Sequence, residues 1–172
     1  NDILQLSHLD NVSETGAAPA METVDLLDVA KDCVERQKLN AQRSFISLTY
    51  LGESARVLGN RDQLDELCQN LCDNAIRYNR PGGKVQIITA CTRDGHCSLT
   101  VKDNGIGIPK EAQSSVFERF YRVDKSRSKA TGGTGLGLAI VKHIARIHNA
   151  RIKLESEIGE GTTITVLFET AH

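Results

Sequence analysis

The sequence predicts an α+β fold, a two-layer α/β sandwich in which helices and mostly antiparallel strands share one hydrophobic core. Two observations support this class. Stretches with helical periodicity, the strongest over residues 61–78, stand apart from the strand-like stretches and do not alternate with them one by one. The strand-like stretches also form two hairpins, 84–101 around Arg93-Asp94-Gly95 and 151–168 around residues 158–161, which indicates an antiparallel sheet.

The N-terminal residues are set apart from the rest by their composition. An amphipathic pattern over residues 3–9 predicts the last turns of a helix. Residues 11–20 are rich in Ser, Thr, Gly, Pro and Ala, which predicts a linker. We therefore expect residues 1–20 to be a helix end plus linker and residues 21–172 to be one domain. Because the chain starts without Met and within a helical pattern, we also expect it to be part of a longer protein.

Within the domain, capping and turn residues mark where the elements begin and end. Asp25 is placed to cap a helix that runs to about Gln42, and the strong helix at 61–78 ends at Asn79-Arg80-Pro81-Gly82-Gly83. A third helix stops at Asn149, a residue that tolerates the left-handed conformation of a C-terminal cap. The remaining predicted elements are strands at 21–24, 47–51 and 55–58, the last two around a Gly52-Glu53 turn, and a short helix near 110–117.

Composition excludes several classes of protein. A net charge of −1 over 172 residues lacks the basic excess that duplex binding requires, so we expect no nucleic-acid partner. No apolar run approaches the length needed to span a membrane, and no signal peptide is evident. The apolar share of 40% and the charged share of 25% are those of a soluble globular domain.

The cysteines favour a packing role over a metal site. They are odd in number, with no Cys-x-x-Cys pair: Cys33, Cys68, Cys72, Cys91 and Cys97. Cys68 and Cys72 lie one helical turn apart, but no histidine or second cysteine pair completes a zinc set. We therefore expect all five to be small, buried, reduced side chains in a reducing compartment.

A glycine-rich stretch, Thr131–Ile140, opens into the third predicted helix. Where a loop opens into a helix, backbone N–H groups without partners and the helix dipole form a seat for phosphate, and glycines allow close approach. The stretch lacks the Lys-Ser/Thr of a Walker A loop and the spacing of the dinucleotide-binding glycine motif. A flexible hinge before a core helix explains it equally well, so this stretch alone leaves both interpretations open.

The helix at 61–78 places two carboxamides beside its apolar face. Its apolar stripe is Leu64, Leu67, Leu71 and Ala75. Asn70, Asn74 and Arg77 lie along a neighbouring stripe. A buried amide without partners costs about 1–3 kcal/mol, so two stacked amides suggest a function. Their oxygens suit Mg²⁺ that carries a nucleoside triphosphate, and Arg77 can reach a phosphate. The alternative is a solvated polar edge.

The run Asp103-Asn104-Gly105-Ile106-Gly107-Ile108-Pro109 follows a predicted strand directly. A carboxylate at a strand end can accept a hydrogen bond from the exocyclic amine of adenine, whereas guanine presents a carbonyl there and would be repelled. Asp103 therefore predicts selectivity for adenine. The alternative is an ordinary turn in which Asp or Asn initiates and glycines supply positive φ.

A polar, basic segment separates this turn from the phosphate loop. It begins with Phe117-Glu118-Arg119-Phe120-Tyr121-Arg122 and continues through residues 123–131, which have few apolar anchors. We interpret it as a mobile lid over the phosphates, anchored at its front end by Phe117 and Phe120. A disordered basic loop is the alternative, and it differs only in whether ATP orders the segment.

Four of these pieces, in this order, resemble the ATP-binding domain of sensor histidine kinases, within the wider family that includes gyrase, Hsp90 and MutL. The matching motifs are the N box Asn70–Tyr78, the first glycine box Asp103–Pro109, the F box Phe117–Arg122 and the second glycine box Gly132–Leu138. The resemblance covers residues 21–169. It implies that residues 21–172 are a catalytic ATP-binding domain and that residues 1–20 are the end of a dimerisation helix plus linker. Leu6–Asp10 and the linker also resemble the phosphate-sensor type of these kinases.

The resemblance implies a Bergerat fold, a mixed, largely antiparallel sheet covered on one face by three main helices. ATP and Mg²⁺ are the implied cofactors. Asp103 would read adenine with help from Thr162, Asn74 would hold Mg²⁺ with Asn70 assisting, and Asn70, Arg77 and Arg122 would be the catalytic residues. The implied nucleotide contacts are Asn70, Asn74, Arg77, Tyr78, Asp103, Gly105, Gly107, Ile108, Phe117, Gly132, Gly133, Thr134, Gly135, Leu136, Gly137, Leu138 and Thr162.

One position separates two classes of enzyme. Family members that hydrolyse ATP carry a Glu four residues before the Mg²⁺-binding Asn, where it acts as a general base. That position is Asn70 here, and an amide takes no proton at neutral pH. The neutral imidazole of an acceptor histidine is already nucleophilic and needs little activation. Asn70 therefore favours a histidine kinase over an ATPase.

The implied function is to position MgATP for transfer of the γ-phosphoryl group to a histidine on a dimerisation domain that is absent from this chain. None of His8, His96, His143, His148 and His172 stands in the sequence context of the acceptor, so we expect the isolated chain to be inactive. The implied partners are that dimerisation domain and a response regulator, in a cytoplasmic part of a membrane-anchored homodimer. A hydrolytic ATPase and a non-catalytic nucleotide-binding module remain the alternatives.

Overall fold

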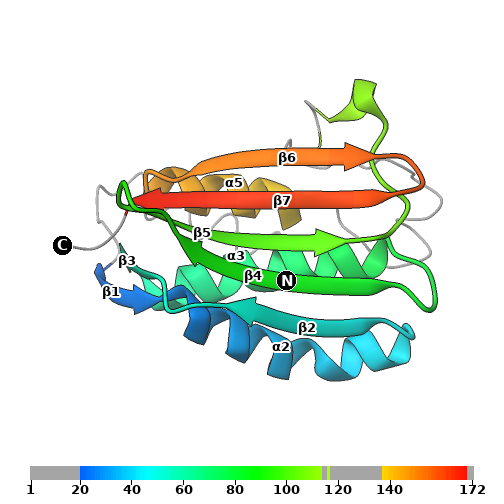
Figure 1. Cartoon of the computed structure of the whole chain (residues 1–172), viewed down its shortest axis with the longest axis horizontal. Coiled ribbons are helices and arrows are strands. Elements are labelled where there is room, and N and C mark those ends of the chain that lie inside the picture. Colours follow the sequence, from blue (N-terminus) through cyan, green and yellow to red (C-terminus); the bar gives the residue numbers. More distant parts are fainter. Residues whose placement is uncertain (1–19, 114–115, 117–136, 170–172) are drawn as a thin grey trace.

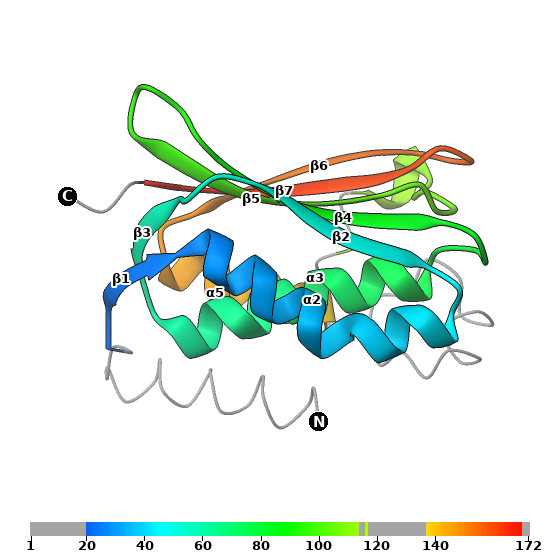
Figure 2. The same cartoon turned by 60° about the horizontal axis from the view of Figure 1, so that its bottom comes forward.

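The computed structural model describes residues 20–113, 116 and 137–169. In these residues a five-stranded sheet is covered on one face by three helices, and a two-stranded sheet lies beside it (Figure 1, Figure 2). The elements are β1 Glu22–Asp25, α2 Leu26–Arg43, β2 Ser47–Gly52, β3 Arg56–Gly59, α3 Arg61–Arg77, β4 Lys84–Cys91, β5 His96–Asp103, the 3₁₀ turn Lys110–Ala112, α5 Gly137–Ile147, β6 Arg151–Glu157 and β7 Gly161–Glu169. The predicted α+β class, the mixed sheet and the three helices on one face are confirmed.

The larger sheet has the order β2-β4-β5-β7-β6. β4, β5, β7 and β6 pair antiparallel, while β2 runs parallel to β4. The core lies between this sheet and helices α2, α3 and α5, because alternate residues of β4, β5 and β7 point toward the helices. Fully buried side chains from both layers meet there, among them Leu67, Leu71, Ile87, Leu99, Ile144, Val166 and Phe168. The two predicted hairpins are present as β4–β5 and β6–β7.

Asp25 and Asn149 cap helices as predicted, and Asn60 is a further cap that was not predicted. The Asp25 side chain accepts a hydrogen bond from Leu27 N at 3.0 Å, and the Asn60 side chain accepts one from Gln63 N at 3.0 Å. Asn149 adopts φ 54° just after α5, as a left-handed C-terminal cap requires. The buried His148 links this end of α5 to the start of α3, since its Nε2 accepts from Asn60 N at 3.0 Å.

The two strands predicted on either side of Gly52-Glu53 do not pair with each other. Both strands exist, but β2 belongs to the large sheet and β3 pairs with β1. Glu53 explains why the chain does not fold back, because its backbone N–H donates to Thr89 O at 3.1 Å and its carbonyl accepts from Thr89 Oγ1 at 2.7 Å. Two bonds to β4 thus hold the chain along the sheet edge before it crosses to β3. Of the short helix predicted near 110–117, the described residues contain only the 3₁₀ turn Lys110–Ala112.

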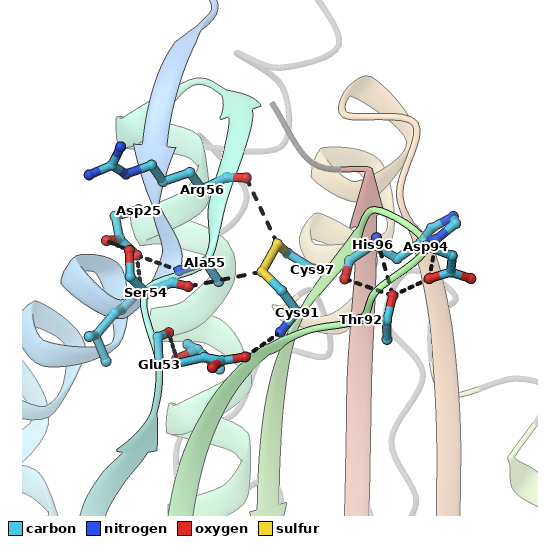
Figure 3. Close-up of a disulfide and its surroundings, with 12 residues drawn as sticks. Asp25, Glu53, Ser54, Ala55, Arg56, Cys91, Thr92, Asp94, His96 and Cys97 are labelled. Carbon is cyan, nitrogen blue, oxygen red and sulfur yellow. Dashed lines mark hydrogen bonds and ion pairs between the residues drawn. A yellow bond between two sulfur atoms is a disulfide. The ribbon is translucent and has the colours of Figure 1, made fainter. Parts of the chain in front are cut away.

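The cysteine prediction holds for three residues and fails for two. Cys33, Cys68 and Cys72 are buried free thiols in the core. Cys91 and Cys97 instead form a disulfide across the β4–β5 hairpin (Figure 3). They face each other in register, and the neighbouring pair is the hydrogen-bonded one, with Thr92 N donating to His96 O at 2.7 Å. Side chains are closest in the pairs between such bonds, which the sequence spacing alone did not show.

Candidate nucleotide-binding site

Asp103 is the last residue of β5 and points into the helix-covered side of the sheet. One carboxylate oxygen is already used: Oδ1 accepts from Gly105 N at 2.8 Å and from Thr162 N at 3.2 Å. No described residue donates a hydrogen bond to Oδ2. The side chain is therefore fixed through one oxygen, while the other can accept a hydrogen bond from an N–H group of a ligand.

Burial raises the pKa of the Asp103 carboxyl to about 6, even though the two backbone N–H groups act in the opposite direction. At neutral pH the carboxyl is still mostly ionised. Its charge is then only partly satisfied by the protein, because two neutral N–H groups share one oxygen. A ligand that donates to Oδ2 would supply the missing interaction.

Thr162 lies directly opposite Asp103 in the β5–β7 ladder, as a role beside Asp103 requires. Its hydroxyl is 2.8 Å from Ser156 Oγ on β6. Ser156 Oγ in turn accepts from Ile108 N at 2.7 Å, and Gln113 Nε2 donates to Ser156 O at 3.0 Å. Ser156 thus ties the first glycine box to the β6–β7 hairpin. Neither Ser156 nor Gln113 was predicted, although the alternation Ile152, Leu154, Ser156 does place the serine on the inner face of β6.

The first glycine box packs against the end of α3. Ile106 N donates to Tyr78 O at 3.1 Å, and a Cβ atom on Gly105 would lie 2.4 Å from the same oxygen. Gly107 has φ +78°, and a Cβ atom there would lie 2.2 Å from Glu157 O. Both glycines are therefore needed for backbone packing. Their contact with nucleotide, like that of Ile108, stays a prediction.

The polar stripe of α3 ends at this same place, since Asn74 lies one turn before Tyr78. Asn70 Nδ2 donates to Glu66 O at 2.9 Å, and no described residue bonds to its Oδ1. No hydrogen bond joins the Asn74 side chain to another described residue. Arg77 Nε pairs with Asp73 Oδ2 at 3.1 Å, and both side chains are about one-third exposed. Three half-buried polar groups thus lie beside the apolar stripe, two of them with an unused amide oxygen.

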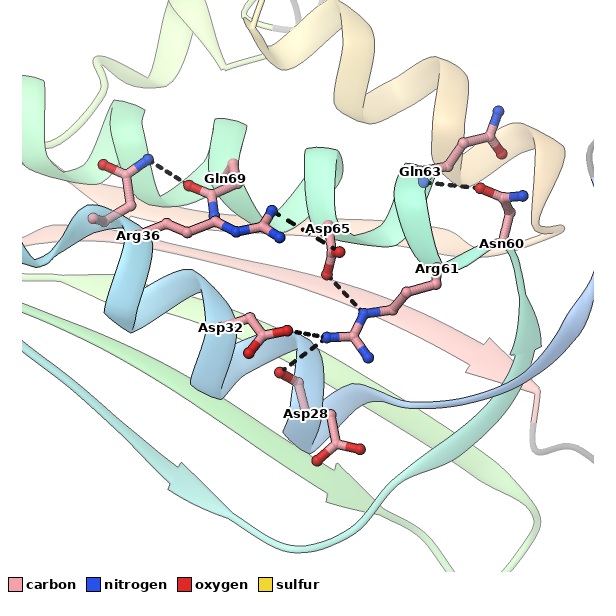
Figure 4. Close-up of polar contacts among 9 residues, drawn as sticks. Asp28, Asp32, Arg36, Asn60, Arg61, Gln63, Asp65 and Gln69 are labelled. Carbon is pink, nitrogen blue, oxygen red and sulfur yellow. Dashed lines mark hydrogen bonds and ion pairs between the residues drawn. The ribbon is translucent and has the colours of Figure 1, made fainter.

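A ladder of polar contacts joins α3 to α2 along the other edge of the apolar stripe, away from Asn70 and Asn74 (Figure 4). Arg61 bonds to Asp32 and, at 2.9 Å, to Asp65. Gln37 Nε2 donates to Gln69 Oε1 at 2.7 Å. The last rung joins Asn40 Nδ2 to Asp73 Oδ1 at 3.4 Å, and Asp73 is the partner of Arg77. The ladder fixes the rotation of α3 about its axis, which the sequence did not reveal.

Several predicted site residues fall outside the described part of the chain. They are Phe117, Arg122, Gly132, Gly133, Thr134, Gly135 and Leu136, together with the predicted lid at 123–131. Gly137 begins α5, and Leu138 packs against the core from its first turn. The predicted helix is therefore present, while the predicted glycine-rich loop at 131–136 lies outside the described residues.

The donors on α3 suit magnesium better than a softer metal. Within the described residues no group of three or more His, Cys, Asp and Glu could hold a metal ion. Mg²⁺ uses one or two protein oxygens together with waters and phosphate oxygens. The unused oxygens of Asn70 and Asn74 fit that pattern. No helix in the described part of the chain is long and apolar enough to cross a membrane.

One end of this α+β sandwich thus holds a carboxylate oxygen and two amide oxygens that accept no hydrogen bond from another described residue. Residues 59–172 match the family model for histidine kinase-, DNA gyrase B-, and HSP90-like ATPases. The chain therefore belongs to this family. Comparison with individual members shows which kind of protein in this family the chain resembles.

The sensor-like histidine kinase SenX3 of Mycolicibacterium smegmatis is 44% identical over 166 residues, which are 96% of this chain and 42% of that protein. The solved structure of the mycobacterial sensor histidine kinase MprB matches with a TM-score of 0.75 at 30% identity, covering 87% of this chain and 97% of that one. Full-length ShkA in complex with AMPPNP matches with a TM-score of 0.80 at 25% identity, covering 99% of this chain and 35% of that one. The domain is thus an ATP-binding catalytic domain of the sensor histidine kinase kind, in a chain that spans less than half the length of SenX3.

Replacing Ser156 with Ala should lower the free energy of unfolding by about 1–3 kcal/mol, because Ile108 N loses its acceptor in a partly buried position. Urea unfolding followed by circular dichroism measures this. Ser98→Ala, on the face of the same sheet that points away from the helices, is the matched control and should change stability by less than about 0.5 kcal/mol. Equal effects of the two substitutions would show that Ser156 does not tie the glycine box to β6.

Proposed function

We propose that this chain binds MgATP and transfers its γ-phosphoryl group to a histidine of its own dimerisation domain. The observation that carries the proposal is the Asp103 carboxylate, which is fixed through Oδ1 and has an unused Oδ2. The adenine amine donates to Oδ2, while the Thr162 hydroxyl lies beside the ring. Guanine would turn a carbonyl toward the same oxygen, so the site selects adenine.

The triphosphate extends from the adenine toward α3 and the second glycine box. Asn74, assisted by Asn70, supplies amide oxygens to Mg²⁺, which neutralises phosphate charge when it is bound. Arg77 and Arg122 approach the phosphates, with Tyr78 and Phe117 beside the nucleotide. The glycine box supplies backbone N–H groups through Gly132, Gly133, Thr134, Gly135, Leu136, Gly137 and Leu138, and the first glycine box lines the adenine pocket through Gly105, Gly107 and Ile108.

Transfer then depends on positioning and on charge, as in other phosphoryl transfers. The attacking nitrogen is an imidazole on the dimerisation domain, the P–O bond to ADP breaks, and ADP leaves with the negative charge. Asn70 stands where a base for water would be needed and its amide accepts no proton, which supports transfer to histidine over hydrolysis. Of the three described histidines, His148 is buried, His143 has a buried Nε2 atom and His96 pairs with Asp94 at 3.3 Å, which does not favour any of them as the acceptor.

The remaining parts of the proposal rest on the relatives. The acceptor domain precedes this domain, with residues 1–20 as its last helix turns and the linker, and residues 21–172 form the catalytic domain. A response regulator receives the phosphoryl group from the histidine. We infer a sensor of the phosphate-sensor type, working as a membrane-anchored homodimer with this domain in the cytoplasm, in line with the similarity to SenX3. With a net charge of −1, the chain has no basic excess for nucleic acid.

Asp103→Asn should weaken ATP binding by about 1.5–3 kcal/mol, the contribution of a hydrogen bond to a charged group, while the fold is kept. Isothermal titration calorimetry with ATP and GTP measures it. Asp94→Asn, at the exposed tip of the same hairpin, is the control and should leave affinity unchanged. Equal affinity of the unmodified chain for ATP and GTP would contradict the adenine assignment.

The raised pKa of Asp103 gives this interaction a pH dependence. Protonation below a pKa of about 6 removes the charged acceptor, so ATP affinity should fall by up to about tenfold between pH 7.5 and pH 5. In the unfolded chain the Asp103 carboxyl has its ordinary, lower pKa, so in this pH window the folded domain without nucleotide binds more protons than the unfolded chain. The free energy of unfolding should therefore decrease as the pH rises. Asp103→Asn should retain only the dependence that comes from the phosphates. Parallel pH profiles of the two proteins would show that Asp103 does not contact adenine.

Asn74→Ala should remove the Mg²⁺ dependence of ATP affinity and leave circular dichroism unchanged, because the side chain has no hydrogen bond to another described residue. Titrations with and without EDTA provide the measurement. Gln86→Ala, a half-buried amide on the outer face of the sheet, should leave the Mg²⁺ dependence intact. A loss of folded structure in Asn74→Ala would instead make Asn74 a structural amide.

The isolated chain should bind MgATP but neither label itself nor hydrolyse ATP appreciably. Adding the histidine-bearing dimerisation domain should restore transfer weakly, because the high effective concentration provided by the covalent linker is lost. The measurement is acid-labile radiolabel on the added domain after incubation with γ-labelled ATP. Brisk phosphate release by the isolated chain, abolished by Asn74→Ala, would identify an ATPase. Binding without transfer to any added domain would identify a non-catalytic nucleotide-binding module.

A further inference from the structure

A second chemically reactive site lies at the end of β5 farthest from Asp103. Cys97 is the second residue of β5, whereas Asp103 is the last. The Cys91–Cys97 disulfide joins β4 and β5 at the turn end of their hairpin, on either side of the turn at residues 92–95 (Figure 3). The disulfide is thus separated from the nucleotide site by most of the length of a strand.

Only one of the five cysteines is open to solvent. Cys33, Cys68, Cys72 and Cys97 have exposed fractions of 1% or less, whereas Cys91 is half-buried. Thiol–disulfide exchange requires a thiolate to reach a sulfur. An external thiol can therefore attack the disulfide at Cys91, while the three core thiols are shielded from it.

Each sulfur of the disulfide also lies beside a backbone carbonyl on the neighbouring segment, residues 53–56. Cys91 Sγ is 4.0 Å from Ser54 O, and Cys97 Sγ is 3.9 Å from Arg56 O. A disulfide sulfur has no proton to donate, but a thiol has one. The reduced pair would therefore find two acceptors already in place and would bond outward to this segment.

This segment holds the beginning of α2. Asp25, the N-cap of α2, accepts from Ala55 N at 2.9 Å and from the Ser54 hydroxyl. Leu26 N donates to Ala55 O at 2.8 Å. The segment that faces the two sulfurs therefore also fixes β1 and the first turn of α2, where the described domain begins.

We propose that Cys91 and Cys97 form a reversible thiol–disulfide site whose redox state changes how tightly residues 54–56 are held against the hairpin. The co-reactant is a small thiol such as glutathione, or a dithiol. Its thiolate attacks Cys91 Sγ, the S–S bond breaks, and Cys97 leaves as a thiolate that takes up a proton. A second thiol releases Cys91, so that two cysteine thiols and one external disulfide result, with two electrons transferred. The reverse reaction restores the bond.

The chemical test is to equilibrate the chain in buffers that span the ratio of reduced to oxidised glutathione. After acid quenching, free thiols are alkylated in denaturant, the remaining disulfides are reduced and alkylated with a heavier reagent, and peptides are weighed. Cys91 and Cys97 should convert together at one intermediate ratio, while Cys33, Cys68 and Cys72 stay thiols throughout. Two free thiols at every ratio, or a bond that persists at every ratio, would overturn the proposal.

The structural test is hydrogen exchange of the backbone amides of Leu26, Leu27 and Ala55 in the two redox states. Two S–H···O contacts should slow their exchange by about threefold or more in the reduced chain. The double variant Cys91→Val, Cys97→Val keeps side chains suited to a strand and should show one exchange rate in both buffers. Cys68→Ala, which leaves the hairpin pair intact, should still respond to the buffer. Equal exchange in the two states of the unmodified chain would overturn the proposed coupling to α2.

Discussion

The structure around the candidate site depends on keeping one charged carboxylate, Asp103, in a mostly buried position. A buried charge is costly unless hydrogen-bond donors reach it, and here the donors are the backbone N–H groups of Gly105 and Thr162. Gly105 is the second residue after the end of β5, and Thr162 lies on the neighbouring strand β7. The loop must therefore turn back tightly and β7 must approach closely. At Gly161, whose φ is +129°, a Cβ atom would lie 2.1 Å from Asp103 O.

The elements around Asp103 are held by side chains that make several contacts each. Arg80 donates to Gly105 O at 3.3 Å and to Gly159 O at 3.1 Å, so one guanidinium links the end of α3, the glycine box and the β6–β7 turn. Asn104 Oδ1 accepts from Lys84 N at 2.7 Å and fixes the start of β4 to the same loop. These contacts join the loop after β5 to three other segments, so several segments together hold Asp103 in position.

The sequence predicted the features that depend on local pattern. Periodicity and turn chemistry predicted the α3 boundaries, the cap residues Asp25 and Asn149 and the two hairpins. Asp103 was predicted to lie at the end of a strand. The N-cap Asn60 was not predicted. The parallel pairing of β2 with β4 was not predicted, because it joins segments separated by a helix and leaves no local signal. The Ser156 contact and the Cys91–Cys97 bond likewise depend on register between strands, which sequence spacing does not reveal.

Helix α3 carries two polar stripes, and they differ in how far the protein itself satisfies them. Of its 17 residues only Asp62 is exposed, while Asn70 and Asn74 are half-buried and still partly accessible to water. One polar stripe is used by the ladder to α2 through Arg61, Asp65, Gln69 and Asp73. The other, Asn70 and Asn74, is half-buried and has no comparable partners among the described residues. Water can meet these half-buried amide oxygens in the free domain, and under the proposed function Mg²⁺ would take its place when MgATP binds.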